Sequence, residues 1–418
     1  MTLSAGGDAI QELTLEELRN KVGTGMEIED AEEHMLLSMG PQHPSTHGVL
    51  RLLVELDGET VVNLAPDIGF LHTGIEKNME AKTYTKALVM TDRMDYLSPM
   101  SNNLGYILAI EKLLGVEATP RAQVIRVILT ELQRVASHLV WLGTSALDLA
   151  AMSVFLYCFR EREYILDLFE MVAGQRMMVS YFRPGGLWRD VPEEFVPAVR
   201  QFLDFMPAKI ADYEALLKNN PIFLGRTKGV GVISAEDAIS WGLTGGSLRG
   251  SGVNYDVRKA TPYCGYEDYD FDVPLETDGD VYARYLVRME EMRQSLRIIE
   301  QALNKLPDGP VQIADRKIVP PPRSELGHSM EAVIHHFKLW TEGFSAPAGF
   351  VYQAIESPRG EFGVYLRGDG GPKPARVHFR APSYVNLAAL PRMAKNLFVA
   401  DVVAIIGSID IVLGEIDR

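Results

Sequence analysis

A long helix that begins at Thr119 is the feature that most constrains the fold. Thr119 suits an N-cap, and Pro120 suits the first helical turn, where an amide hydrogen would have no helical partner. Apolar residues then recur at steps of three or four along one face: Val124, Ile128, Leu132, Val135, Leu139 and Leu142. We therefore predict one long helix with a continuous apolar face.

Further helices are expected to pack beside it. A second stripe of alternating three- and four-residue steps runs from Tyr282 to Leu306, which is typical of a long helix packed lengthwise on others. Residues 155–177 and 193–218 show the same periodicity, and we expect a kink at Pro207. Residues 72–117 have the pattern of short helices. Together these segments predict a helix bundle.

The apolar stretch Val135 to Phe159 has the length of a membrane span. If His138 is neutral, Asp148 is its one charged residue. A carboxylate in the middle of a span is costly, and Gly143 lies nearby. We therefore favour two soluble helices that meet deep in a large core near Asp148.

Short strand patterns flank the helices. Residues 49–56 and 61–64 predict a hairpin turned at Asp57-Gly58, and residues 351–379 predict a small antiparallel sheet. Two terminal helices are predicted near 383–395 and 399–407. The expected fold class is α+β and mostly helical. Four regions follow along the chain: an acidic arm at 1–32, a small sheet with a histidine loop at 33–70, the helical bundle at 71–350 with overlying loops at 219–279, and a small sheet with helices at 351–418.

Composition limits the partners. Acidic side chains outnumber basic ones by 56 to 41, which gives a formal charge of −15. Nucleic acid and anionic lipid would repel such a chain, so we expect proteins or small molecules as partners. The N-terminus lacks the features of a signal peptide, and Cys158 and Cys264 lack the spacing of a redox motif or iron-sulfur site. A reducing, cytosolic compartment is expected.

The segment Gly40–Gly48 gathers two of the nine histidines. Pro41 and Pro44 push the residues before them away from helical angles, so the segment is a loop. His43 and His47 have the spacing of a helical metal pair, but Pro44 prevents that helix, and we predict no metal site. The pattern alone is compatible with both an inert surface turn and a functional loop.

No nucleotide-binding motif occurs in the sequence. Residues 219–279 are rich in glycine, but they contain no Gly-x-x-x-x-Gly-Lys-Ser/Thr and no strand leading into Gly-x-Gly-x-x-Gly. We therefore expect that NADH does not bind to this chain.

Several motifs together resemble the D-subunit family of the proton-pumping NADH-quinone oxidoreductases, bacterial respiratory complex I. The resemblance covers the chain except its N-terminal arm. It is carried by Gly40–Gly48, Asp67–Lys77, Arg93–Leu97, Leu243–Arg249, Gly252–Arg258, Glu356–Glu361, Ala381–Ser383 and the last residues. It implies a fold similar to the large subunit of nickel-iron hydrogenases.

That hydrogenase subunit holds its metal with an N-terminal Arg-x-Cys-Gly-x-Cys and a C-terminal Asp-Pro-Cys-x-x-Cys-x-x-His. The resemblance places other residues at these ligand positions: Asp95 and Ser98 in the first motif, and Val412, Glu415 and Arg418 in the second. Soft thiolates hold such metals, so a hydrogenase is excluded. The resemblance implies that the former metal cavity accepts another ligand.

In the family that ligand is a quinone, bound between this subunit and a smaller partner that carries the terminal four-iron, four-sulfur cluster. The matching residues are His47 and Tyr96, with His43 as a further quinone-binding candidate. A quinone becomes basic as electrons arrive, and a tyrosine hydroxyl and an imidazole can both donate protons to it. The residue that matches the carboxylate partner of His47 is Asp148. A carboxylate at this position would favour the charged form of the His47 imidazole. When His47 loses its proton, Asp148 would be left as a buried anion.

Two further residues are implied to lie near the partner's cluster. Arg93 resembles an arginine whose fixed positive charge favours the reduced cluster. Met178 stands where most relatives have a histidine, so one titratable neighbour of the cluster is missing here. A pH dependence of the cluster potential therefore cannot be carried over from relatives.

The resemblance implies a peripheral subunit at the cytoplasmic face of the cell membrane, held there by partner subunits that carry the FMN and the iron-sulfur clusters. We expect this chain to bind no cofactor itself. Two alternatives stay open: the equivalent subunit of a relative fed by ferredoxin or a deazaflavin donor, and a catalytically silent scaffold. In a scaffold, Tyr96 would be an ordinary core tyrosine and Asp148 a helix-end cap. The quinone and the electron donor are not identified by the sequence.

Overall fold

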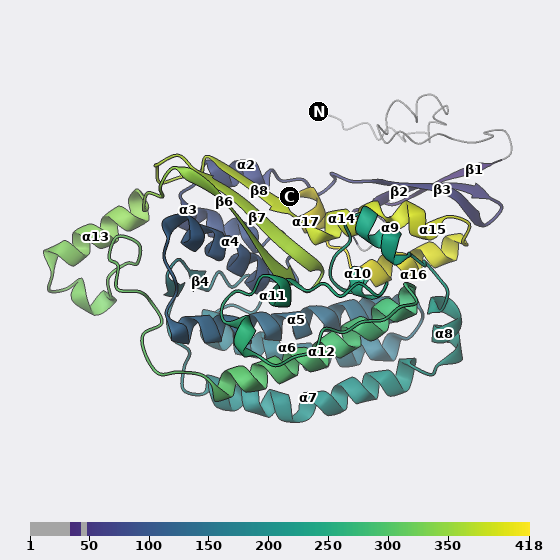
Figure 1. The fold of residues 1–418 in the computed structure, drawn as a ribbon, viewed down its shortest axis with the longest axis horizontal. Helices are drawn as coiled ribbons and strands as arrows, with labels where there is room; N and C mark the ends of the chain where they lie inside the picture. Colours follow the sequence, from purple (N-terminus) through teal and green to yellow (C-terminus); the bar gives the residue numbers. More distant parts are fainter. Residues whose placement is uncertain (1–33, 43–47) are drawn as a thin grey trace, which may run out of the picture.

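Four long helices lie lengthwise beside one another at the base of the molecule (Figure 1). The computed structural model describes residues 34–42 and 48–418. In it α5 packs on α6 and α12, and α7 packs on the same two helices, which closes a four-helix bundle. Their bounds are Pro120–Asp148 for α5, Met152–Ala173 for α6, Phe195–Leu217 for α7 and Val281–Asn304 for α12. The predicted bundle is confirmed.

The apolar stretch around Asp148 forms two helices, as predicted. The α5 helix ends at Asp148 and α6 begins at Met152, after a turn in which Ala150 has a φ of 65°. Gly143 lets the helices approach closely, because a Cβ atom there would lie 3.4 Å from the Cα atom of Phe155. Among the residues that the structure describes, no helix has the length and apolar character needed to span a membrane.

Two three-stranded antiparallel sheets flank the bundle, in the order β1-β2-β3 and β6-β7-β8. The hairpin and the small sheet predicted from the sequence are both present, with β1 as an additional strand. A minor hairpin, β4-β5, lies between α6 and α7 in the chain. The strands are β1 Met35–Met39, β2 Arg51–Asp57, β3 Thr60–Asp67, β4 Phe182–Arg183, β5 Gly186–Leu187, β6 Gly349–Ser357, β7 Gly360–Gly368 and β8 Arg376–Arg380.

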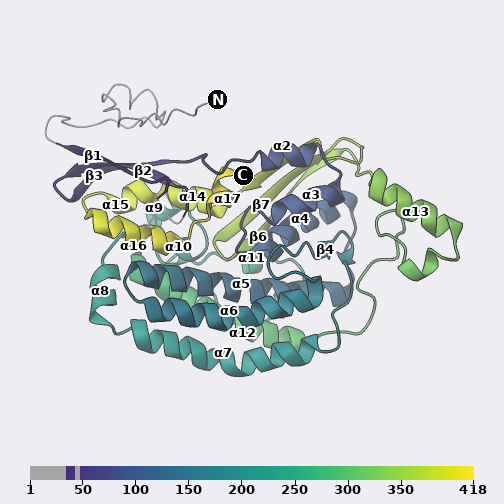
Figure 2. The same ribbon diagram turned by 180° about the vertical axis from the view of Figure 1, so that it is seen from behind.

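Shorter helices connect these layers, and Figure 2 shows from behind how α14 to α17 gather between the first sheet and the bundle. They are α2 Ile75–Glu80, α3 Tyr84–Thr91, α4 Pro99–Leu114, α8 Pro221–Thr227, α9 Ala235–Ser240, α10 Gly246–Arg249, α11 Val257–Ala260, α13 Met330–Thr341, α14 Pro382–Ala388, α15 Leu390–Ala394, α16 Val399–Ile409 and α17 Leu413–Asp417. Two short 3-10 helices span Tyr266–Asp268 and Arg323–Glu325.

One helix prediction was wrong in detail. The segment 383–395 forms two helices, α14 and α15, instead of one. Pro391 lies in the first turn of α15, where it needs no helical amide partner, whereas in the middle of one longer helix its ring would clash with the preceding turn. The chain therefore bends at Ala389, which serves as the C-cap of α14 and the N-cap of α15.

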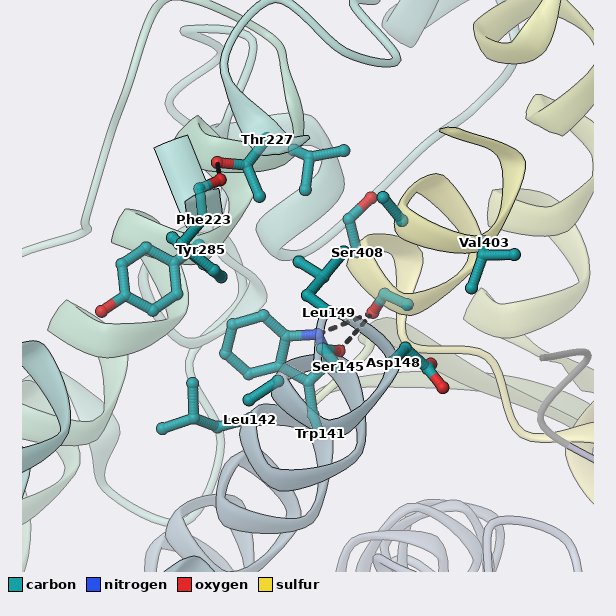
Figure 3. Close-up of a pocket in the computed structure, with 14 residues that line it drawn as sticks. Trp141, Leu142, Ser145, Asp148, Leu149, Phe223, Thr227, Tyr285, Val403 and Ser408 are labelled. Carbon is teal, nitrogen blue, oxygen red and sulfur yellow. Dashed lines mark hydrogen bonds between the residues drawn. The ribbon is translucent and has the colours of Figure 1, made fainter. Parts of the chain in front are cut away.

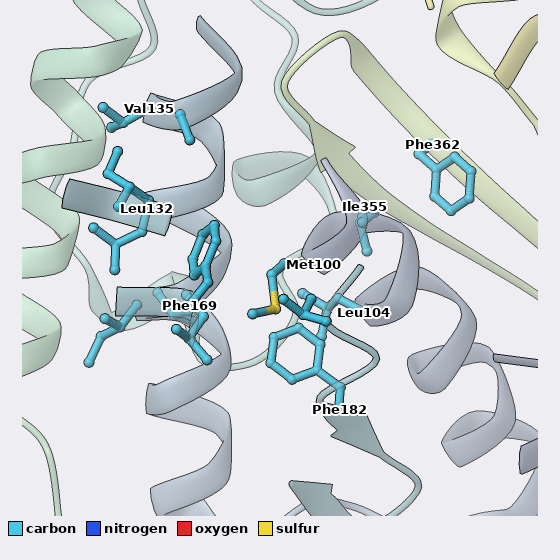
Figure 4. Packing of buried hydrophobic residues seen from close by; sticks show 14 of the residues in the cluster. Met100, Leu104, Leu132, Val135, Phe169, Phe182, Ile355 and Phe362 are labelled. Carbon is cyan, nitrogen blue, oxygen red and sulfur yellow. The ribbon is translucent and has the colours of Figure 1, made fainter. Parts of the chain in front are cut away.

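The main hydrophobic core joins the bundle to the second sheet (Figure 4). Met100 and Leu104 of α4 lie between α5 and the sheet, where Phe362 of β7 is fully buried. At Gly105 a Cβ atom would come within 2.9 Å of the Phe362 ring, so α4 and β7 approach too closely for a side chain there. This packing fixes the β6-β7 turn above α5.

Candidate functional site

Arg359, in the β6-β7 turn, is the centre of a buried group of charges. Gly360 follows it with a φ of 133°, and a Cβ atom there would lie 2.5 Å from Thr244 Oγ1, so the turn packs tightly on the preceding loop. The fully buried Arg359 guanidinium donates to Asp95 at 2.6 Å and to Asp410 at 3.4 Å. It also donates to the Ser137 hydroxyl of α5 at 2.9 Å.

Asp95 comes from the loop between α3 and α4. Its Oδ1 atom accepts a hydrogen bond from the Leu97 amide at 3.1 Å. The Asn102 side chain donates to the carbonyl oxygens of Thr91 and Asp95, which ties the loop to the first turn of α4. Burial raises the pKa of Asp95; Arg359 opposes this and the Asp410 carboxylate adds to it.

Glu415 and Asp410 come from the last helices. Asp410 ends α16 in the left-handed conformation, with a φ of 53°, and so turns the chain into α17. Glu415 of α17 accepts a hydrogen bond from the Ser383 hydroxyl at 2.7 Å. Burial, together with the nearby Asp95 carboxylate, raises the pKa of Glu415 to about 8. We call Asp95, Arg359, Asp410 and Glu415 the carboxyl cluster.

The carboxyl cluster joins the two segments that resemble hydrogenase metal motifs. A Cβ atom on Gly414 would lie 2.5 Å from the Met94 carbonyl oxygen, so α17 rests directly on the segment before Asp95. The Ser98 hydroxyl donates to the Ser101 hydroxyl at 2.8 Å, and the Ser98 amide donates to the Asp95 carbonyl oxygen at 3.0 Å. Val412 is buried, and Arg418 donates to the Phe379 carbonyl oxygen. Within the described residues, no group of three histidine, cysteine or acidic side chains is arranged to hold a metal ion.

Sequence reasoning gave no role to Arg359, Asp410, Ser383 or Ser137. Arg359 and Ser383 do lie in motifs that carry the family resemblance, and Asp410 interrupts an otherwise apolar terminal stretch. A charged residue within an apolar stretch is expected to be buried and then needs a partner. This expectation was the signal that could have singled out Asp410. It could not tell which distant residue supplies that partner.

Tyr96 lies half-buried next to the carboxyl cluster. Burial raises the pKa of its hydroxyl; Arg359 opposes this and the Asp95 carboxylate adds to it. The hydroxyl is therefore protonated at neutral pH and available as a donor. Among the described residues no hydrogen bond to this hydroxyl is formed.

Asp148 is the last residue of α5 and is half-buried, so the expectation of a deeply buried carboxylate was wrong. Asp148 is partly exposed because it lies at the end of α5, where the chain turns at the surface before α6. It borders a mainly apolar pocket with Trp141 and Leu149, and its carboxylate points away from the Trp141 ring (Figure 3). Its predicted partner His47 and the other loop histidine, His43, lie outside the described residues, so that pairing stays a prediction.

Arg93 and Met178 lie on neighbouring segments. The Ser180 hydroxyl, two residues after Met178, donates to the Asp92 carboxylate at 2.5 Å, next to Arg93 in the chain. Arg93 is exposed and donates to the Val89 carbonyl oxygen at 2.7 Å, whereas Met178 is half-buried. The segments that carry the two residues are thus in contact, while the place of both side chains near the partner's cluster stays a prediction.

A second group of buried charges lies between α5, α12 and β6. Within it Arg249 binds Glu356 at 2.8 Å and also binds Glu291, while Arg258 binds Asp256 at 2.7 Å and Glu131 at 3.1 Å. Arg134 binds Glu131 at 3.1 Å, and His138 lies 3.0 Å from Glu291. We call this set the paired cluster: Glu131, Arg134, His138, Arg249, Asp256, Arg258, Glu291 and Glu356. Every carboxylate in it has a basic partner.

Comparison with known proteins identifies the family. The family model described as "Respiratory-chain NADH dehydrogenase, 49 Kd subunit" matches residues 148–418. The chain is 64% identical over 389 residues to an NADH-quinone oxidoreductase D subunit of Chloroflexus aurantiacus, which covers 92% of this chain and 95% of that protein. It is 65% identical over 394 residues to an NADH-quinone oxidoreductase D subunit of Roseiflexus castenholzii, covering 94% of each.

A more distant relative, the NADH-quinone oxidoreductase D subunit of Geotalea uraniireducens, is 58% identical over 386 residues, which cover 92% of this chain and 99% of that protein. The likeness thus extends over nearly the whole chain, including both segments that meet in the carboxyl cluster. The chain belongs to the 49 kDa subunit family of respiratory-chain NADH dehydrogenase and is a D-type subunit of complex I.

Proposed function

We propose that this subunit forms a quinone-binding cavity together with the smaller subunit that carries the terminal iron-sulfur cluster, and that quinone reduction there is coupled to proton translocation. The observation that carries the proposal is the half-buried Tyr96 hydroxyl, which is protonated and lies beside buried charges where the two hydrogenase-like segments meet. A quinone oxygen that gains electrons needs such a donor.

In this proposal Tyr96 and His47 donate protons to the two quinone oxygens. Electrons come from the partner's iron-sulfur cluster, and this chain supplies positions and protons. Asp148 stabilises the His47 imidazolium, and His43 contributes to quinone binding from the same loop. Arg93 and Met178 face the partner's cluster, where Arg93 favours the reduced form by its fixed charge.

The subunit would be held at the cytoplasmic face of the membrane by its partners and would have no oxidoreductase activity alone. Its acidic composition supports attachment through proteins, because a charge of −15 is repelled by anionic lipid. Other subunits select the electron donor, so a relative fed by ferredoxin or a deazaflavin would use the same cavity.

Replacement of Tyr96 by phenylalanine separates a quinone site from a silent scaffold. Tyr96→Phe removes one hydroxyl and keeps the ring that packs. We expect an assembled complex in which quinone reductase activity falls about 100-fold, the lower end of the usual range for a proton donor. Flavin-site activity with an artificial acceptor should stay unchanged.

Tyr365→Phe is the matched control, because Tyr365 is also half-buried but lies on β7, where it stacks on Phe350. It should leave both activities intact. Wild-type quinone turnover in the Tyr96→Phe complex would remove Tyr96 from the site and favour the scaffold.

A further inference from the structure

The carboxyl cluster contains more negative than positive charge. Asp95, Asp410 and Glu415 are 1%, 6% and 1% exposed, and they share the single guanidinium of Arg359, which is 0% exposed. If all three carboxyls were ionised, these four residues would carry a net charge of −2, and the buried Arg288 guanidinium of α12, which acts on Asp410, would offset only one of the two charges. Removing even one such charge from water costs several kcal/mol, so the cluster retains a proton near neutral pH.

The contacts favour Glu415 among the three carboxyls as the holder of this proton. Asp95 and Asp410 are ion-paired with Arg359, at 2.6 and 3.4 Å. Glu415 has no ion pair within the described part of the chain, and the Ser383 hydroxyl is its hydrogen-bond partner there. A carboxyl without a cationic partner is the cheapest of the three to keep neutral. The raised pKa of Glu415, about 8, agrees with this assignment.

The cluster also has unused hydrogen-bonding capacity. Arg359 Nε and Asp410 Oδ2 are both buried, and neither has a hydrogen-bond partner among the described residues. Buried polar atoms are rarely left without partners unless the site has a function or binds water. A proton or a water molecule can therefore move within the cluster without first breaking an existing ion pair.

Resting on the function proposed above, we propose that Glu415 is the proton store that restores Tyr96 after Tyr96 has protonated the reduced quinone. The Tyr96 O–H bond breaks as the quinone oxygen takes its proton, with electrons supplied by the partner's iron-sulfur cluster. The tyrosinate then takes the proton of the Glu415 carboxyl, through Asp95 or water, and leaves a carboxylate. Glu415 regains a proton from solvent before the next turnover.

The position of Asp95 supports this route. It adjoins Tyr96 in the chain, and its carboxylate influences the pKa of both Tyr96 and Glu415. The charged groups that act on Glu415 are Asp95 from the α3-α4 loop, Arg359 from the β6-β7 turn and Arg418 at the end of α17. Asp410, at the end of α16, acts on Arg359 and on the buried Arg288 of α12. Glu415 acts through Tyr96 and has no assigned contact with quinone.

The first test is the pH profile of quinone reduction by the assembled complex. Wild-type activity should fall as the pH rises through about 8, where Glu415 loses its proton. Glu415→Gln should lower quinone turnover at least tenfold, below the usual effect of a direct proton donor, and should abolish this alkaline limb. Glu415→Asp should restore part of the rate. Flavin-site activity with an artificial acceptor should stay unchanged.

Ser383→Ala gives an independent test with a defined sign. The Ser383 hydroxyl lowers the pKa of Glu415 by its hydrogen bond. Removal of this hydroxyl should therefore shift the alkaline fall of activity to higher pH. Glu276→Gln is the control: burial also raises the pKa of Glu276, but this residue lies by the Arg249 backbone. It should leave the alkaline fall in place. If Glu415→Gln fails to assemble, Ser383→Ala still decides the proposal.

Infrared difference spectra of the reduced minus the oxidised complex measure the protonation of carboxyl groups directly. A purely structural role of Glu415 would leave these spectra unchanged. A protonated-carboxyl C=O band should change on quinone reduction and be missing in Glu415→Gln. A normal rate, alkaline limb and infrared band in Glu415→Gln would overturn the proton store while leaving the function of Tyr96 intact. Normal quinone activity in Tyr96→Phe would instead overturn the proposed function.

Discussion

The paired cluster and the carboxyl cluster are both buried groups of charges, but they differ in balance. In the paired cluster, three arginines face four carboxylates, and each carboxylate has an arginine within 4 Å. His138 also lies beside Glu291, but burial lowers the pKa of its ring. In the carboxyl cluster, three carboxyls share Arg359, and Glu415 is left with a hydroxyl. Burial of charge alone is therefore a poor marker of function, and imbalance is a better one.

The pKa values follow the same division. Burial alone would raise the pKa of Glu131, but Arg134 and Arg258 lower it to about 2. Asp256 is likewise brought to about 2, mainly by Arg258 acting against burial. In the carboxyl cluster burial prevails, and the pKa values of Asp95 and Glu415 are raised. Glu356 departs from this division, because burial and the Asp256 carboxylate raise its pKa although Arg249 is its partner. Glu131, Asp256 and Glu291 thus stay ionised at physiological pH, whereas the carboxyl cluster can exchange a proton.

The largest effect is expected from breaking the paired cluster. Arg249→Met should destabilise the chain by about 3–5 kcal/mol, because it leaves Glu291 and Glu356 buried without their arginine. Such a loss is a large share of the usual stability of a folded protein, about 5–15 kcal/mol. The variant should be recovered mainly as unfolded or aggregated chain, measured by thermal unfolding of the purified protein.

Arg297→Met is the matched control, because Arg297 also pairs with two carboxylates, Asp270 and Asp272, but at the surface. It should cost less than about 1 kcal/mol. An equally small loss for Arg249→Met would remove the structural role assigned to the paired cluster.

A smaller effect is expected on the pH dependence of stability. With a pKa of about 8 in the folded chain and an ordinary value of 4.5, Glu415 binds its proton more tightly when folded. Its contribution to the free energy of unfolding is therefore complete below pH 4.5 and is lost as the pH rises towards 8. Glu415→Gln should remove this slope, so that the stability of the variant relative to wild type rises by up to about 1.4 kcal/mol for each pH unit in this range.

Melting temperatures of both chains at several pH values check this expectation. Glu131→Gln supplies the contrast: the wild-type Glu131 pKa of about 2 lies below the tested range, so any loss of stability in that variant should be independent of pH between 5 and 8. Parallel pH curves for wild type and Glu415→Gln would show that Glu415 is already ionised when folded.

The smallest effect concerns Met178. An imidazole next to an iron-sulfur cluster binds its proton more tightly when the cluster is reduced, so the cluster potential falls as the pH rises. Methionine cannot titrate, and the partner's cluster should have a nearly constant potential between pH about 6 and 8. Met178→His should introduce a slope of less than ~59 mV per pH unit, the limit for one electron and one proton.

Redox titration by electron paramagnetic resonance at several pH values measures this slope. The same titration tests the function assigned to the carboxyl cluster, because the proton of that cluster is assigned to quinone reduction and not to reduction of the iron-sulfur cluster. A steep slope already present with Met178 would mean that another group, such as Glu415, is coupled to the iron-sulfur cluster.

The fold was largely predictable from the sequence because its main elements are long and strongly periodic. The stripes of α5 and α12 and the small sheet formed by β6, β7 and β8 were all predicted. The errors arose where local pattern gives no sign: Pro391 divides a segment whose apolar pattern continues through it, and Asp148 is half-buried because of how the chain turns after α5.

The site was predictable only in part. The resemblance indicated that Asp95 and Glu415 occupy corresponding ligand positions, and the structure brings them together. It did not indicate Arg359 as their neighbour, because contacts between residues so far apart in sequence leave no periodicity, and it gave no role to Asp410 although Asp410 lies five positions before Glu415. The histidines at 43 and 47 lie outside the described residues, and their role remains a prediction.

The contact of Gly414 with the Met94 carbonyl oxygen has a consequence for biosynthesis. The two residues are separated by roughly 320 positions, and a ribosome that adds about 5–20 residues per second needs roughly a quarter of a minute to one minute to translate them. Throughout this time Asp95 has no helix above it, and Arg359 arrives long after it. The carboxyl cluster therefore forms last, when the bundle and both sheets already exist, and a messenger that stops a few codons early would yield a well-folded bundle without a closed site.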